Sequence, residues 1–165
     1  MSVKNSYPQL PEIAYCRTSV DMKRVAAYAQ STVGRYEKEV VRMAYCIFLN
    51  ESARGTKGVN HNYAGIQADC GQWSGLEGAV ATSVRKDSGG VIRRFICFSE
   101  TEGFRNTFNL LLYACKKRGM YIGALGVSDW NQLGISYLKK WVGRPAIKAD
   151  SGFKLLYQES TKAIV

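Results

Sequence analysis

One carboxylic acid stands where a helical pattern predicts an apolar residue. From position 36 to about position 54, apolar residues recur at the spacing of an amphipathic helix, and the next place on that stripe is Glu51. The apolar members of the stripe are Tyr36, Val40, Met43, Ala44, Ile47 and Phe48. Burial and the negative end of the helix dipole both raise the pKa of a carboxyl group. Such a group holds a proton near neutral pH, as a general acid must.

A structural interpretation of Glu51 stays open beside the chemical one. Burying an ionised carboxylate costs several kcal/mol unless it is paired. Arg54, three residues further on, could pair with it, or the last turn of the helix could direct the carboxylate outward.

The residues around Glu51 form a longer motif. The segment from Phe48 to Gly55 reads FLNESARG, and the segment from Asn60 to Asp69 reads NHNYAGIQAD. A Glu-Ser pair at the end of a buried helix, then a Gly-rich loop and an Asn-aromatic-x-Gly-Ile segment, resembles the core motif of the lysozyme superfamily, in particular glycoside hydrolase family 73 glucosaminidases. The second segment is also similar to the Gly-Leu-Met-Gln segment of goose-type lysozymes and lytic transglycosylases. Residues 93–99, RRFICFS, look like the family 73 strand end that leads into a Ser-capped helix.

The resemblance spans about residues 36–142 and implies both a fold and an activity. The fold would be lysozyme-like, an α+β class that is mostly α with a small β-hairpin. The activity would be cleavage of the β-1,4 backbone of bacterial peptidoglycan, as an N-acetylglucosaminidase, a muramidase or a lytic transglycosylase. Glu51 would be the proton donor. Neither a cofactor nor a metal is implied.

The second acid departs from the family 73 pattern. A further Glu is expected there on the first hairpin strand, where this chain has Thr82-Ser83-Val84. Asp69 matches an Asp that goose-type enzymes carry, so we expect it to hold a water molecule, with Glu77 and Asp87 in reserve. Carboxyl groups about 5–5.5 Å apart indicate retaining chemistry, and about 6.5–9.5 Å inverting chemistry. With no second acid in reach, a transglycosylase that closes a 1,6-anhydro ring becomes plausible.

Sugars bind through aromatic faces and through amides. Asn62, Tyr63 and Gln67 occupy motif positions that suit substrate binding, and the aromatic candidates are Trp73, Trp130 and Tyr137. Core packing is the alternative for an aromatic residue on a helical stripe. His61 is the only histidine and has no neighbouring Cys or His, so a loop hydrogen bond is favoured over a metal site. The five widely spaced cysteines indicate reduced thiols.

The patterns predict helices around one hairpin. We expect helices over 20–33 and 36–54, from a Ser99 cap to Gly119, from a Ser128 cap to Gly143, and from an Asp150 cap onward. Runs 80–85 and 91–98 predict the hairpin, and Ser99 to Glu102 a capping box. Residues 55–78 are too polar and Gly-rich for regular structure. Residues 1–18 would form an irregular arm, followed by one catalytic domain over 19–165.

Composition limits the partners. The chain has 165 residues and a net charge of +10, so we expect a monomer that attracts a polyanion. No apolar run predicts a membrane span or a signal peptide, so a wall-cleaving enzyme would be phage-encoded, or released by a holin, a virion or a secretion system. Two alternatives remain: a glycan-binding or virion protein of lysozyme fold that does not cut, and a nucleic-acid-binding protein. The second would use Arg93, Arg94, Lys116, Lys117, Arg118, Lys139 and Lys140.

Overall fold

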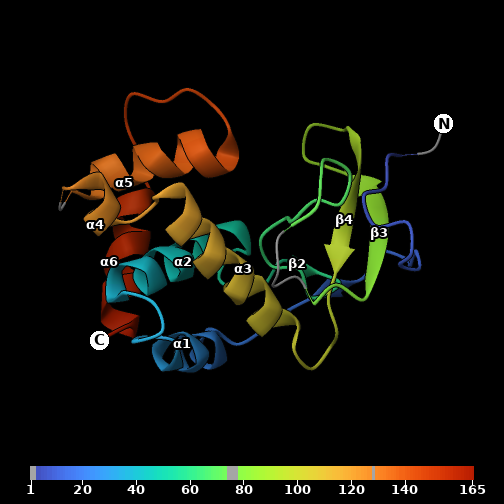
Figure 1. Cartoon of the computed structure of the whole chain (residues 1–165), viewed down its shortest axis with the longest axis horizontal. Helices are drawn as coiled ribbons and strands as arrows, with labels where there is room; N and C mark the ends of the chain where they lie inside the picture. Colours follow the sequence, from blue (N-terminus) through green and yellow to red (C-terminus); the bar gives the residue numbers. More distant parts are fainter. Residues whose placement is uncertain (1–2, 74–77, 128) are drawn as a thin grey trace.

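The computed structural model describes residues 3–73, 78–127 and 129–165. Helices gather at one end of the molecule and a two-stranded hairpin lies at the other (Figure 1). The chain is therefore α+β and mostly α with a small β-hairpin, as the sequence predicts. Two residues named above, the reserve acid Glu77 and the predicted cap Ser128, lie outside the described residues.

Helix α2 (Lys38–Glu51) forms the centre of the core. It packs against α1 (Met22–Ser31), α3 (Gly103–Arg118) and α6 (Phe153–Ala163). The sequence predicted one apolar stripe, but the buried residues cover most of the helix circumference: Val40, Val41, Met43, Ala44, Tyr45, Cys46, Ile47, Phe48 and Leu49. A helix that is apolar all round is one that other elements enclose. The last residue of α2, Glu51, is thus carried by a rigid element.

The predicted hairpin is confirmed. Strands β3 (Ala81–Lys86) and β4 (Ile92–Cys97) pair antiparallel. The second motif segment runs along the free edge of β4, since the backbone N–H of Ala68 donates to Arg94 O at 2.8 Å and that of Ile96 donates to Ile66 O at 3.0 Å. This pairing attaches the residues after Asn60 to the hairpin, so the motif bridges the helical part and the β part.

The N-terminal arm belongs to the same folded unit. Ile13 N–H donates to Thr82 O at 2.8 Å and Thr82 N–H donates to Pro11 O at 2.9 Å, which lays the arm along β3. Strand β1 (Arg17–Thr18) pairs with β2 (Gly58–Val59). The expectation of an irregular arm, and of a segment 55–78 without regular structure, was wrong at these two short strands, because each supplies the backbone partner that the other lacks.

The other helices begin and end close to their predicted limits. Helix α1 is capped by Asp21, whose side chain accepts from Lys23 N–H at 2.9 Å. Before α3, Ser99 Oγ accepts from Glu102 N–H at 3.2 Å, but this bond closes a turn: the helix begins at Gly103 and its N-cap is Glu102, which makes no side-chain capping hydrogen bond, so the predicted capping box was wrong.

Beyond α3 the chain forms one helical turn that the sequence did not predict, α4 (Ile122–Leu125), followed by α5 (Trp130–Tyr137) and a π-helical turn η1 (Leu138–Val142). The predicted cap of the last helix, Asp150, instead pairs its side chain with Arg144 at 3.1 Å, while its carbonyl accepts from Phe153 N–H. Within the described ranges, no helix combines the length and the apolar character needed to cross a bilayer.

Candidate functional site

A cleft of about 470 Å³ lies between the helical part and the hairpin, and we call it the Glu51 cleft. The end of α2 and the turn η1 line one side, and the hairpin and the second motif segment line the other. Its charged lining residues are Glu51, Lys57, Arg85 and Asp87. A second hollow of about 270 Å³ adjoins it, with shared lining residues Ala64, Gly65, Gln67, Trp141 and Val142. Glu51 therefore faces a groove with two lobes.

Helix α2 ends at Glu51 because the following residues form a tight left-handed turn. Ser52 is fully buried, and its Oγ donates to Phe48 O at 2.6 Å and accepts from Gly55 N–H at 2.8 Å. The two residues after Ser52 have φ values of 47° and 58°, a region that non-glycine residues rarely adopt. Gly55 follows with φ 81°. The Glu-Ser pair and the glycine of the motif thus have a structural explanation: they stop the helix where Glu51 meets the cleft.

Two donors hold the half-buried carboxyl group of Glu51. Tyr137 OH donates to Glu51 Oε1 at 2.6 Å, and Trp141 Nε1–H donates to the same oxygen at 3.1 Å. Asn50 Nδ2 donates to the Tyr137 hydroxyl at 2.9 Å, so the hydroxyl hydrogen is left to point at Glu51. Among the described residues, none hydrogen bonds to Oε2. Oε2 is the oxygen that can present a proton to a molecule in the cleft.

Burial raises the pKa of Glu51 above its ordinary value, and it outweighs the hydrogen bonds from Tyr137 and Trp141, which lower it. The predicted alternative partner, Arg54, pairs with Glu159 at 2.6 Å instead. The direction of the shift agrees with the one expected from the apolar stripe. Burial also raises the pKa of Tyr137, which keeps its hydroxyl protonated and donating.

Trp141 is a site residue that the sequence reasoning missed. Its indole comes to Glu51 on the π-helical turn η1, which ends at Gly143 with φ 85°. Such turns are common at functional sites. Trp141 shares a helical face with Tyr137, four residues earlier, and that spacing is also typical of core packing. The same spacing could have been taken as two donors aimed from consecutive turns at one group.

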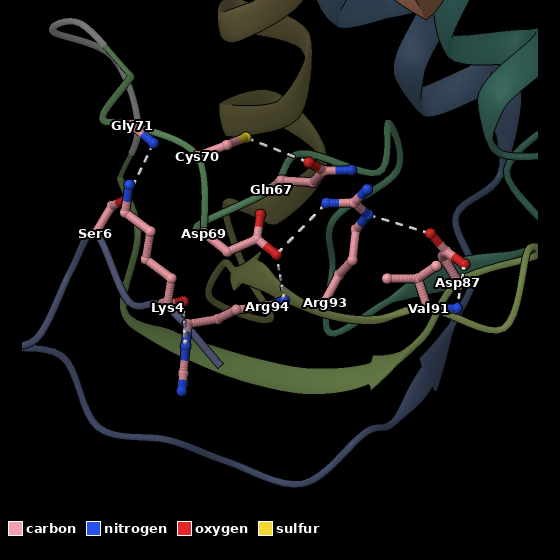
Figure 2. Close-up of polar contacts among 10 residues, drawn as sticks. All are labelled: Lys4, Ser6, Gln67, Asp69, Cys70, Gly71, Asp87, Val91, Arg93 and Arg94. Atoms are coloured by element: carbon pink, nitrogen blue, oxygen red, sulfur yellow. Dashed lines mark hydrogen bonds and ion pairs between the residues drawn. The ribbon is translucent and has the colours of Figure 1, made fainter. Parts of the chain in front are cut away.

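Asp69, the expected second acid, is not among the described residues that line the Glu51 cleft. Its side chain is only 8% exposed. Asp69 Oδ2 accepts from Arg94 N–H at 3.2 Å and lies 3.9 Å from Arg93 Nη1 (Figure 2). These contacts attach the motif segment to β4. The geometry therefore gives Asp69 a structural role and lends no support to a catalytic one.

Asp87, one of the two reserve acids, does line the cleft. Its Oδ1 accepts from the N–H groups of Gly89 and Val91, both at 2.9 Å, and its Oδ2 accepts from Arg93 Nε at 3.1 Å. Arg93 thus lies between Asp69 and Asp87 (Figure 2). The hydrogen bond from Val91 foremost, and those from Arg93 and Gly89, lower the pKa of Asp87. Asp87 stays ionised and already has three donors.

Asn62, a predicted substrate-binding residue, lines the cleft but uses its amide internally. Its Nδ2 donates to Ile66 O and Ile96 O, both at 2.9 Å, and its Oδ1 accepts from Ala64 N–H and Ile66 N–H, both at 3.2 Å. These four bonds use every hydrogen of the amide nitrogen and shape the loop. The role of Asn62 in the motif is thus explained by folding.

Tyr63 and Gln67, the other two motif residues, also line the cleft. Tyr63 is buried and stacks on Phe48 with ring centroids 5.3 Å apart, which makes it largely a core residue. Gln67 is half-buried and lines both lobes, and its Oε1 accepts from Cys70 Sγ at 3.3 Å. Gln67 is therefore the motif amide best placed to meet a ligand.

The remaining aromatic candidates differ in whether they line the groove. Trp73 lines the second lobe and packs against Trp141 with ring centroids 5.9 Å apart. Trp130 lies at the start of α5, where it is 37% exposed under the ammonium of Lys154, and it is not among the described residues lining either lobe. The structure thus places Glu51 and Trp73 in the lining of the groove. Tyr137 donates to Glu51 but, like Trp130, is not among the described residues that line either lobe, so neither is placed to bind a sugar there.

Among the other reactive groups, Cys70 lines the second lobe, and His61 is not among the described residues lining either lobe. His61 is half-buried, and its backbone N–H donates to Thr18 Oγ1 at 3.0 Å. The part of the chain that the structure describes contains no group of three His, Cys, Asp or Glu residues able to hold a metal ion. All five cysteines are free thiols.

Comparisons of the chain with protein-family models, with curated proteins and with solved structures found no match. The function must therefore be argued from the site itself.

Proposed function

We propose that the protein cleaves the β-1,4 glycan backbone of bacterial peptidoglycan, with Glu51 as the general acid. The observation that carries this proposal is the state of Glu51: a carboxyl group with a raised pKa, at the end of a rigid helix, in the lining of an open cleft and with both of its described donors on Oε1. The motif resemblance noted above supports the same substrate.

The hydrogen bonds of Glu51 suit proton donation. When the carboxyl group is protonated on Oε2, Oε1 is its carbonyl oxygen and can accept from both Tyr137 and Trp141. The proton moves from Oε2 to the glycosidic oxygen as the bond from that oxygen to the sugar C1 breaks. The carboxylate left behind keeps both donors, which stabilise its charge.

The state of Asp87 favours the transglycosylase outcome over hydrolysis. Its carboxylate is already occupied by two backbone N–H groups and by Arg93, so it is a poor base for activating water. In the transglycosylase route, Glu51 acts first as the acid and then as the base. After donating its proton, it takes the proton of the 6-hydroxyl of the same sugar, while that oxygen forms a bond to C1 and closes a 1,6-anhydro ring. Glu51 returns to its protonated state and no water is consumed.

The rival nucleic-acid function finds less support in the basic residues first assigned to it. Arg94 is buried and pairs with Glu12 at 2.6 Å, and Arg93 lies between two aspartates. Lys116 pairs with Glu37 at 2.6 Å. These three cations are engaged within the chain and are poor phosphate ligands.

Mass spectrometry of products tests the proposal and its finer form. Purified peptidoglycan is digested with the wild-type protein and the soluble fragments are analysed before and after borohydride reduction. The expected products carry 1,6-anhydro ends, which do not gain mass on reduction. Reducing sugar ends would show a hydrolase and overturn the single-acid route. No release of fragments from walls of several chemotypes would overturn the function.

A further inference from the structure

The second lobe of the groove, lined by Gln67, Cys70, Trp73, Arg118 and Trp141 among others, has a composition of its own. We call it the Arg118 lobe. Its volume is about 270 Å³, and Arg118 is the one charged residue among its described lining residues. Trp141 lies between the Arg118 lobe and Glu51, since its indole donates to Glu51 and also forms part of the wall of the lobe. A ligand held in the Arg118 lobe therefore lies beside the bond that Glu51 would cleave.

The guanidinium group of Arg118 is held between the two aromatic walls. It lies 5.8 Å from the ring centroid of Trp73 and 5.4 Å from that of Trp141, within the range of cation–π attraction. Its Nη1 also donates to Lys140 O at 3.0 Å, which anchors the far end of the side chain. These contacts reduce the freedom that an exposed arginine would lose on binding a ligand.

Arg118 has no carboxylate partner among the described residues. Other arginines on the surface do have one, as Arg54 has in Glu159 and Arg144 in Asp150. Only Nη1 of Arg118 is engaged in a hydrogen bond within the described part of the chain, so donors of its planar fork remain for a ligand. A fixed guanidinium with unused donors is suited to a carboxylate, which it binds through two parallel hydrogen bonds.

We propose that the Arg118 lobe binds a carboxylate carried by the glycan, with Trp73 and Trp141 packing against the apolar faces of the sugar or acyl group that bears it. This inference rests on the proposed function, because it assigns part of the same substrate to the lobe beside Glu51. Two sources supply that carboxylate in peptidoglycan: the lactyl group of the muramyl sugar, free once the peptide is removed, and the stem peptide attached to it. Both are borne by every second sugar of the strand.

A consequence is that Arg118 fixes the register of the strand. The carboxylate-bearing sugar is held at one distance from Glu51, because Trp141 contacts both Glu51 and Arg118. Only one of the two alternating bonds is then presented to the acid.

Binding measurements on four proteins test the inference: wild type, Arg118→Gln, Arg118→Lys and the control Arg105→Gln. Arg105 is exposed near the start of the same helix, about 20 Å away at the helical rise of about 1.5 Å per residue, so its variant loses the same charge outside the groove. The ligands are a neutral N-acetylglucosamine oligosaccharide, peptide-free muramyl glycan and peptide-bearing glycan. Affinity is read from tryptophan fluorescence and from calorimetry.

Arg118→Gln is expected to weaken binding of at least one carboxylate-bearing glycan by about tenfold or more, since hydrogen bonds to charged groups are the stronger ones. Binding of the neutral oligosaccharide should change by less than about twofold. Arg118→Lys should retain part of the affinity, and Arg105→Gln all of it within about twofold. The glycan that loses affinity identifies the source of the carboxylate.

Two results would overturn the inference: an equal loss on neutral and acidic glycans, which would show a role in packing the tryptophans, or no loss on any glycan. Because binding is measured without turnover, the inference can stand or fall apart from the proposed function. Binding that depends on Arg118 without any cleavage would reject the enzyme and keep the lobe. If Arg118→Gln still cleaves the glycan and still prefers carboxylate-bearing glycans over the neutral one as the wild type does, the carboxylate site in the Arg118 lobe is rejected and the proposed activity stands.

Discussion

Replacing Glu51 by glutamine removes the acidic proton of the carboxyl group and keeps the shape of the side chain. The Gln carbonyl oxygen can still accept from Tyr137 and Trp141, as Oε1 does now, and the amide nitrogen takes the place of Oε2. The variant should fold normally, since its amide is nearly isosteric with the carboxyl group. It cannot donate a proton to a leaving oxygen at any useful pH.

The expected loss of wall-lytic activity is a factor of about 10³ or more, which is about 4 kcal/mol of barrier at about 1.36 kcal/mol per tenfold change. A second effect follows from burial. The folded state raises the pKa of Glu51, so it binds the proton more tightly than the unfolded chain does. Wild-type stability should therefore fall as the pH rises from the unfolded value of about 4.3 through the raised value, and Glu51→Gln should lack this decline.

Turbidity clearing of bacterial walls, measured from pH 4 to 9, gives the activity, and urea unfolding at the same pH values gives the stability. In the wild type, activity should decline on the alkaline side as Glu51 ionises. Glu100→Gln is the matched control, because Glu100 is an exposed residue in the turn before α3. Activity of Glu51→Gln within about tenfold of wild type would refute the reasoning, and so would a wild-type profile that is flat from pH 5 to 9.

Four further outcomes are expected. Tyr137→Phe removes a hydrogen bond that lowers the pKa of Glu51, so the alkaline decline in activity should move to higher pH and the maximal rate should fall, as pH–rate profiles would show. Asp69→Asn and Asp87→Asn should both keep activity within about tenfold of wild type if one acid suffices. Asp69→Asn should also lose about 1 kcal/mol of unfolding free energy, because it weakens the contacts of Asp69 with β4. Loss of activity in Asp87→Asn alone would favour a two-acid mechanism. Ser52→Ala should cost about 1–3 kcal/mol in urea unfolding, because it leaves Gly55 N–H without its acceptor. Raising salt from about 0.1 to 1 M should weaken capture of whole walls by the +10 surface but leave turnover of a short neutral glycan unchanged, and equal losses on both substrates would contradict that division.

The elements with a local signal were predictable from the sequence. Helix α2 and the hairpin follow from periodicity and turn residues, and so does the end of α3 at Gly119, whose φ is 66°. The short strands β1 and β2 were missed because two residues carry no periodicity, and their pairing depends on segments about 40 positions apart in the sequence. The cap of the last helix was misassigned because Asp150 has a nearby cation, Arg144, which competes for its carboxylate.

For the site too, the features with a local signal in the sequence could be predicted and those that depend on distant residues could not. A buried carboxyl group could be inferred for Glu51 because the apolar stripe that buries it is local to one helix. The donors to that carboxyl group could not be inferred from the sequence. Tyr137 and Trp141 lie 86 and 90 positions from Glu51 and contact it only because the C-terminal helices pack against α2.

The second acid shows why residue type and motif position do not suffice to assign a role. Asp69 and Asp87 are both aspartates beside the same arginine, and nothing local distinguishes them (Figure 2). The distinction arises from the strand pairing: segment 66–69 lies along β4, which turns Asp69 toward the backbone of Arg94, while Asp87 lies in the hairpin turn at the cleft. Since Asp69 does not line the cleft and the carboxylate of Asp87 already has three donors, the proposed proton chemistry is assigned to Glu51, whose pKa is raised by burial.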